Sequence, residues 1–85
     1  MKHFVYIVKC RDDSLYTGFT RNPTRRVIEH NTSKKGAKSI RGKLPAELVY
    51  FEEYNTKSEA LKREAEIKSW SRVKKLGLIN KKPKK

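Results

Sequence analysis

The sequence predicts a small α+β domain, a three-stranded antiparallel sheet flanked by helices in the order β-β-α-β-α-α. Three segments rich in β-branched and aromatic residues indicate strands, and a capping motif before a charged, helix-forming stretch indicates a helix late in the chain. With 85 residues, the chain has room for one modest core. We therefore expect one domain over residues 1–80 and a disordered basic tail over residues 81–85.

The first two strands are expected to form a hairpin. Residues 3–10 read HFVYIVKC and residues 15–20 read LYTGFT, with a polar turn between them. A three-residue loop places Tyr6 opposite Gly18 and puts Tyr16 on the same face as Tyr6, whereas a two-residue loop would separate the two phenols. We predict the three-residue loop, and with it an open space beside the Tyr6 ring, where a ligand or backbone would approach closely.

The first helix is predicted to begin after the hairpin. Asn22 is a favourable N-cap and Pro23 suits the first helical position. Arg26 and His30 are four residues apart, so they share one face of this helix. A third strand is expected over residues 46–54, AELVYFEEY.

The second helix opens with a capping box formed by Thr56 and Glu59. Helical spacing gathers four apolar residues on one stripe: Ala60, Leu61, Ala65 and Ile67. Glu64 falls in the middle of this stripe, where a carboxylate is costly unless a cation meets it. Lys68 lies on the same side, and from the helix alone the ion pair is favoured over a metal ion. A short terminal helix over residues 72–80 is expected to pack against Trp70.

The charge of the chain indicates a polyanion as its partner. The sequence has 22 Lys and Arg against 9 Asp and Glu, a net charge of +13, and it stays at +9 without the four tail lysines. Nucleic acid is the first candidate for such a small basic domain. The loop between the first helix and the third strand contributes five cations that we expect to contact phosphate: Lys34, Lys35, Lys38, Arg41 and Lys43.

Other classes of protein are disfavoured. One cysteine, Cys10, permits no internal disulfide and no cysteine-based zinc site. No apolar run approaches the length of a membrane span, and the N-terminus lacks the apolar core of a signal peptide. We therefore expect a cytoplasmic protein with no membrane contact.

The ordered set of Tyr6, Tyr16, Gly18, Arg26, His30 and Glu64 resembles the GIY-YIG endonuclease family. The resemblance is to its small single-domain bacterial branch and covers residues 3–80. Three positions depart from the motifs, with Phe4 and Val5 in the first and Thr17 in the second. The targeting domains of larger family members are absent from this chain, so a protein partner would supply target choice.

The resemblance implies a metal-dependent endonuclease that hydrolyses DNA or RNA, with DNA favoured. It assigns the general base to Tyr16, a phosphate clamp to Arg26 and one Mg²⁺ or Mn²⁺ ion to Glu64. Tyr6 would orient the water or Tyr16, and His30 would contact phosphate or share the proton transfer. The alternative is a nucleic-acid-binding module whose nuclease site is unused. A third possibility, a ribosome-associated basic protein, accounts for the charge but leaves Glu64 unexplained.

Overall fold

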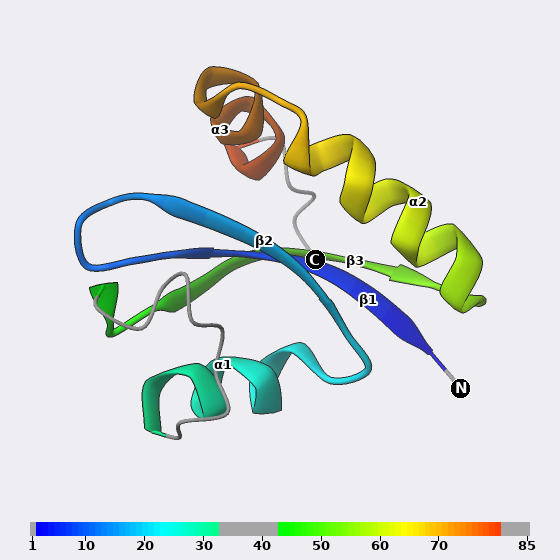
Figure 1. The fold of residues 1–85 in the computed structure, drawn as a ribbon, viewed down its shortest axis with the longest axis horizontal. Helices are drawn as coiled ribbons and strands as arrows, with labels where there is room; N and C mark the ends of the chain where they lie inside the picture. Colours follow the sequence, from blue (N-terminus) through cyan, green and yellow to red (C-terminus); the bar gives the residue numbers. More distant parts are fainter. Residues whose placement is uncertain (1, 33–42, 81–85) are drawn as a thin grey trace.

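The computed structural model describes residues 2–32 and 43–80, and it confirms the predicted α+β fold. Strand β2 lies at one edge of an antiparallel sheet whose strand order is β2-β1-β3. Helix α1 lies on one face of the sheet, and α2 and α3 lie on the other (Figure 1). The elements are β1 (His3–Lys9), β2 (Leu15–Thr20), α1 (Pro23–Thr32), β3 (Glu47–Tyr54), α2 (Lys57–Lys68) and α3 (Arg72–Asn80).

The hairpin has the predicted three-residue loop. Tyr6 pairs with Gly18 and Val8 pairs with Tyr16, so both phenols lie on the face covered by α1. Asp13 in the turn has a φ of 70°, a conformation that aspartate tolerates better than most residues. The loop is closed by a 2.8 Å hydrogen bond from the Cys10 amide to the Ser14 carbonyl.

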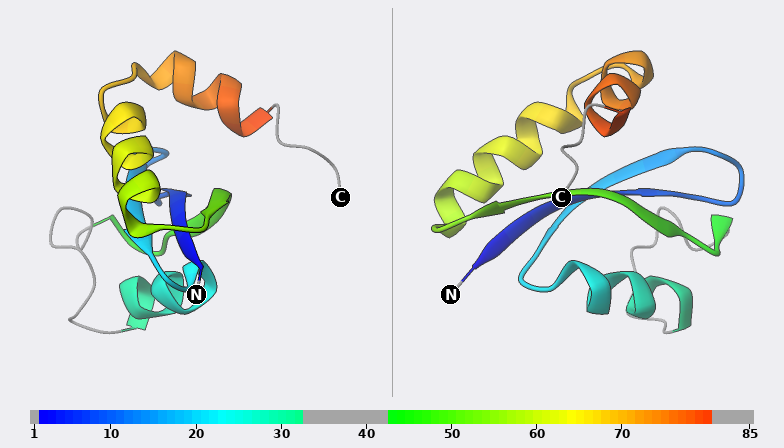
Figure 2. Two further views of the ribbon diagram at one scale, coloured as in Figure 1. Left: turned by 90° about the vertical axis from the view of Figure 1, so that its right-hand side faces the viewer. Right: turned by 180° about the vertical axis from the view of Figure 1, so that it is seen from behind.

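Strand β1 lies between two cores because both faces of the sheet are covered. On the side of α2, Val5 and Ile7 are buried in one cluster with Ala60 and Ile67. On the side of α1, the second cluster has four buried members: Tyr6, Val8, Cys10 and Ala46. A strand buried on both faces reads as a continuous apolar run, which explains the segment FVYIV. Figure 2 shows the sheet between its two helical layers.

Two helix caps form as the sequence predicts. The Asn22 Oδ1 accepts a 3.0 Å hydrogen bond from the Arg25 amide at the start of α1. The Thr56 Oγ1 accepts a 3.2 Å hydrogen bond from the Glu59 amide at the start of α2. These bonds satisfy amide groups that an uncapped helix would leave unpaired. Among the described helices, none is long and apolar enough to cross a membrane.

Helix α2 is rotated relative to the predicted apolar stripe. Ala60 and Ile67 are buried, but Leu61 remains 41% exposed and Ala65 is also exposed. The rotation brings Arg63 onto Glu52 of β3, with nitrogen–oxygen distances of 2.8 and 3.0 Å. This two-point contact between a guanidinium and a carboxylate is strong and directional, so it fixes which side of α2 faces the sheet.

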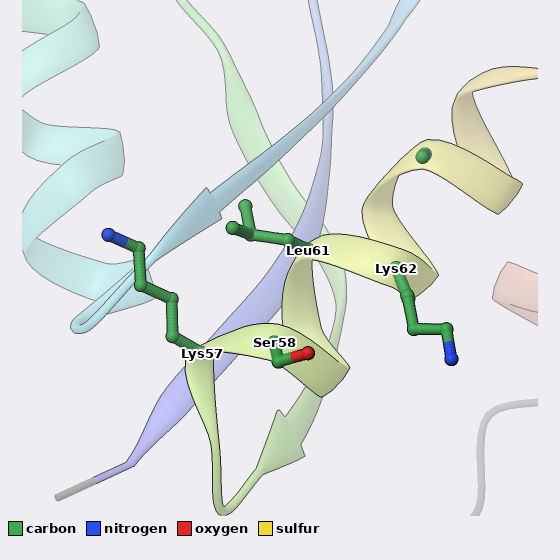
Figure 3. A pocket seen from close by; sticks show the side chains of 5 residues that line it. Lys57, Ser58, Leu61 and Lys62 are labelled. Carbon is green, nitrogen blue, oxygen red and sulfur yellow. The ribbon is translucent and has the colours of Figure 1, made fainter.

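The exposed side of α2 forms a hollow that is separate from the predicted catalytic residues. It is lined by Lys57, Ser58, Leu61, Lys62 and Ala65 (Figure 3). Half of the predicted stripe therefore lines this hollow instead of the core.

Trp70 packs as the sequence predicts. Its ring contacts the core beneath α2 and lies between two cations, 5.1 Å from the Arg63 guanidinium and 4.4 Å from the Lys74 ammonium. Lys74 belongs to α3, so the indole joins the terminal helix to the body.

Candidate active site

Three aromatic side chains form the centre of the candidate site. The Tyr6 hydroxyl lies 3.0 Å from Nε2 of His30, and each residue is only 1% exposed. The Tyr16 ring lies 5.7 Å from the His30 ring in an edge-on arrangement and 6.3 Å from the Tyr6 ring. The hairpin register and α1 together thus assemble residues that are far apart in the chain.

Gly18 does not leave the open space that the sequence suggested. A Cβ atom on Gly18 would lie 2.5 Å from the Tyr6 hydroxyl oxygen and 2.6 Å from the ring carbon that bears it. The close approach at this glycine is therefore made by Tyr6 itself. The missing side chain allows the phenol to lie flat across β2 toward His30.

Arg26 lies beside this cluster, as its place on the His30 face of α1 predicts. Its guanidinium interacts with the Tyr6 hydroxyl and forms a 3.0 Å ion pair with Glu29. Glu29 also pairs with Arg25 at 3.4 Å. Glu29 is not among the predicted site residues, although its spacing of three and four residues from Arg26 and Arg25 is a sequence signal for these ion pairs.

The environment keeps the Tyr6 phenol protonated. Burial raises the pKa of Tyr6 to about 12, the nearby Arg26 opposes this shift, and the charges of Tyr16 and Glu64 add to it. An ordinary tyrosine ionises near pH ~10. Tyr6 is consequently suited to donate a hydrogen bond, and it is poorly suited to take a proton at neutral pH.

His30 is held neutral by its surroundings. Burial lowers the pKa of His30, and the positive charge of Arg26 lowers it further, while Glu29 acts in the opposite direction. A neutral imidazole has one nitrogen that accepts a hydrogen bond and one that donates. His30 can therefore accept from the Tyr6 hydroxyl while that oxygen faces Arg26.

Tyr16 differs from Tyr6 in access and in bonding. It is half-buried, and its hydroxyl makes no hydrogen bond to the part of the chain that the structure describes. Of the two phenols, Tyr16 is the one whose oxygen is available to a water molecule or a substrate.

Glu64 lies close enough to the cluster for its charge to affect Tyr6. Its side chain is 17% exposed and forms a 3.2 Å ion pair with Lys68, which is 52% exposed. The ion pair that the sequence predicted thus exists, but one partner is in solvent. Because Lys68 is a long side chain in water, it can leave Glu64 at little cost.

The donor set of the site fits a magnesium-type ion better than a zinc-type ion. Across residues 2–32 and 43–80, no group of three His, Cys, Asp or Glu side chains is arranged to hold a metal. Mg²⁺ is commonly held by one or two carboxylates, with water and substrate phosphate completing its coordination. Glu64 would provide one such hard oxygen ligand, and the phosphate would come from the substrate.

The basic loop lies mostly outside the described residues, including Lys34, Lys35, Lys38 and Arg41. Lys43, the fifth cation of the predicted set, is described. Its Nζ lies 4.0 Å from the Asp12 carboxylate in the β1–β2 turn. Asp12 itself accepts from the amide and the hydroxyl of Ser14, so it stabilises the turn.

A model of the GIY-YIG catalytic domain matches residues 2–76 of the chain. The chain belongs to the GIY-YIG family. This GIY-YIG domain is 60% identical over 78 residues to a UPF0213 protein of Staphylococcus epidermidis, covering 92% of this chain and 94% of the relative. It is 58% identical over 77 residues to a UPF0213 protein of Staphylococcus aureus, covering 91% and 93%. The family is thus represented by small bacterial proteins of similar length.

Two solved structures resemble this GIY-YIG domain over nearly its whole length. The solution structure of a UPF0213 protein from Bacillus halodurans has a TM-score of 0.63 and 45% identity, covering 96% of this chain and 86% of that one. The solution structure of a protein from E. faecalis has a TM-score of 0.62 and 34% identity, covering 100% and 93%. The family match implies a nuclease-like fold, while the names of these relatives state no activity, metal or catalytic residue.

Proposed function

We propose that this GIY-YIG domain is a metal-dependent endonuclease that hydrolyses phosphodiester bonds of nucleic acid, with DNA favoured over RNA. The observation that supports it best is the contrast between the two phenols. Tyr6 is buried and bonded to His30, whereas the hydroxyl of the neighbouring Tyr16 is free among the described residues. One phenol would orient the reacting groups, and the other would accept the proton.

In this proposal Tyr16 takes a proton from the attacking water. A phenol does so at neutral pH only when nearby positive charge favours its ionised form. Arg26 would supply such charge and would hold two oxygens of the scissile phosphate, since its planar fork matches that geometry. Its partner Glu29 would then be exchanged for the phosphate.

Tyr6 and His30 would hold the reacting groups of the site in position. The Tyr6 hydroxyl, which gives its one proton to His30 and accepts from Arg26, would use the second lone pair of its oxygen to accept from the water or from Tyr16 and so orient it. His30 is only 1% exposed, so the burial supports a positioning role for it over contact with a phosphate oxygen.

Glu64 would hold one Mg²⁺ or Mn²⁺ ion. When bound, such an ion supplies positive charge for the developing charge of the transition state and for the leaving oxygen. Because Glu64 is the one ligand that the described residues would offer in this proposal, we expect the ion to bind weakly until phosphate is present. The Lys68 ammonium would be released from Glu64 at the same time.

Target choice is expected to depend on more than this domain. Binding to the phosphate backbone through a net charge of +13 is largely insensitive to sequence. A protein partner would supply target specificity.

A cleavage assay tests the proposal directly. Pure protein would be incubated with end-labelled single-stranded, duplex, flap and branched DNA and with matched RNA, in Mg²⁺, Mn²⁺ or EDTA. We expect cleavage with either metal and none in EDTA. If every substrate is bound with salt-dependent affinity and none is cut, the domain is a nucleic-acid-binding module instead of an enzyme.

A further inference from the structure

Two phenylalanine side chains form an exposed platform on the sheet face that carries the candidate site. Phe51 pairs directly with Tyr6 in the register of β3 with β1, so its side chain lies on the same face as the phenol. It is 51% exposed, which is unusual for a large ring on a strand. The Phe4 ring packs edge-on against Phe51, with the ring centres 5.8 Å apart.

This platform is not covered by any described helix. Helix α1 lies beneath the half of the sheet that contains the β1–β2 turn, and the half near the chain start has no helix below it (Figure 1). Phe4 packs against Phe51 with the two ring planes 74° apart, and half of Phe51 stays exposed. A rigid, exposed aromatic ring has little conformational entropy to lose when it binds another flat group.

We propose that Phe51, supported by Phe4, stacks on an unpaired nucleobase next to the phosphate held in the candidate site, which rests on the proposed nuclease function. Paired residues of an antiparallel sheet have Cα atoms about 5 Å apart, so the platform lies one side chain away from Tyr6. We expect a strand whose phosphate reaches Arg26 to place an adjacent base on Phe51. Every base has a stacking face, so this contact needs no particular sequence.

The charge around the platform favours a nucleic-acid strand over a second copy of the chain. Two molecules that each carry +13 repel one another. Glu53 lies opposite Phe4 in the register, and its carboxylate is paired with Lys2 at 3.2 Å. A base that is paired inside a duplex cannot present its face to a ring, so the platform predicts a preference for unpaired nucleotides.

The test compares binding without cleavage. Fluorescein-labelled single-stranded DNA and the matching duplex would be titrated in EDTA with wild type, Phe51→Ala and Phe51→Trp. We expect Phe51→Ala to bind the single strand about tenfold or more weakly, to bind the duplex as wild type does, and to keep its circular dichroism spectrum. Phe51→Trp should restore single-strand binding. Val73→Ala is the matched control, because Val73 is 79% exposed on α3, on the opposite side of the sheet.

An abasic scan sharpens the test. One nucleotide of the strand at a time would be replaced by an abasic residue. At one position, this replacement should weaken binding by wild type as much as Phe51→Ala does. The Phe51→Ala variant should bind that abasic strand and the intact strand equally. If Phe51→Ala binds both DNA forms like wild type, or if sedimentation shows a dimer that Phe51→Ala dissolves, the inference is wrong.

The two proposals can fail separately. If Phe51→Ala cuts with unchanged substrate preference, the stacking proposal is wrong and the nuclease proposal stands. If wild type cuts nothing with either metal and Phe51→Ala loses single-strand binding, the nuclease proposal is wrong and the stacking proposal stands.

Discussion

The hydroxyl oxygen of Tyr6 lies 3.0 Å from Nε2 of His30 inside the domain. This contact joins the central strand to α1 beneath the sheet, and it separates the two phenols of the site into one that is bonded and one that is free. Most consequences of the site can be tested by breaking one of these relationships at a time.

Tyr16→Phe should abolish cleavage while preserving the fold. Only a hydroxyl without a partner among the described residues is lost, so we expect no measurable change in melting temperature. If Tyr16 is the general base, the rate should fall about 100-fold or more. Gel-based cleavage and thermal melting measure the two effects, and a variant that cuts at the wild-type rate would show that Tyr16 is not the base.

Tyr6→Phe is the matched comparison and should behave differently. It leaves the buried Nε2 of His30 without its tyrosine partner, and an unsatisfied buried polar group costs about 1–3 kcal/mol. We expect a clear fall in the free energy of unfolding in urea together with reduced cleavage. Equal stability of the Tyr6→Phe and Tyr16→Phe variants would contradict this view of the hydrogen bond.

Gly18→Ala should damage the site although it adds only one methyl group. The new Cβ atom would lie 2.5 Å from the Tyr6 oxygen, and a buried ring cannot move aside freely. We expect a loss of about 1–3 kcal/mol, typical of overpacking, and a displaced phenol. Gly77→Ala is the control, since a Cβ atom there would meet nothing within 4 Å. The tyrosine signals in an NMR spectrum should shift only for Gly18→Ala.

Glu64→Ala should remove metal-dependent cleavage with little change in stability. Its ion pair has one partner that is 52% exposed, and pairs in solvent contribute less than about 1 kcal/mol. Lys68→Ala is the control, because it breaks the same pair and keeps the carboxylate. We expect Lys68→Ala to cut and Glu64→Ala not to. A loss of several kcal/mol in Glu64→Ala, with no metal effect on wild type, would make Glu64 a structural residue.

Stability should fall as the pH drops below about 6.5 because of His30. Burial and Arg26 lower the pKa of His30 in the folded state, while the unfolded chain titrates near pH ~6.5. As the pH drops, the unfolded state takes up the proton first, so the stability present above pH ~6.5 is lost. His30→Gln should flatten this part of the curve in thermal melts. His3 contributes in the same direction, since its pKa is also lowered, so His3→Gln is the comparison.

The element order, the helix caps and the hairpin register follow from the sequence alone. Each depends on neighbours in the chain. A three-residue loop fixes the parity of Tyr6 and Tyr16, and Asn22 and Thr56 lie directly before the helices that they cap. The resemblance to the GIY-YIG family added the candidate catalytic residues, which spacing alone did not distinguish from core tyrosines and surface charges.

The tertiary structure decided which surfaces of these elements are buried. Tyr6 is bonded because α1 docks beneath β1 and brings His30 to it from 24 residues away. Helix α2 exposes Leu61 because the Arg63–Glu52 contact sets the rotation of the helix. Phe51 is exposed because α1 covers only part of the sheet face on which Phe51 lies. These outcomes depend on how helices dock on the sheet, and the free energy of docking is summed over contacts between distant residues, which local periodicity does not contain.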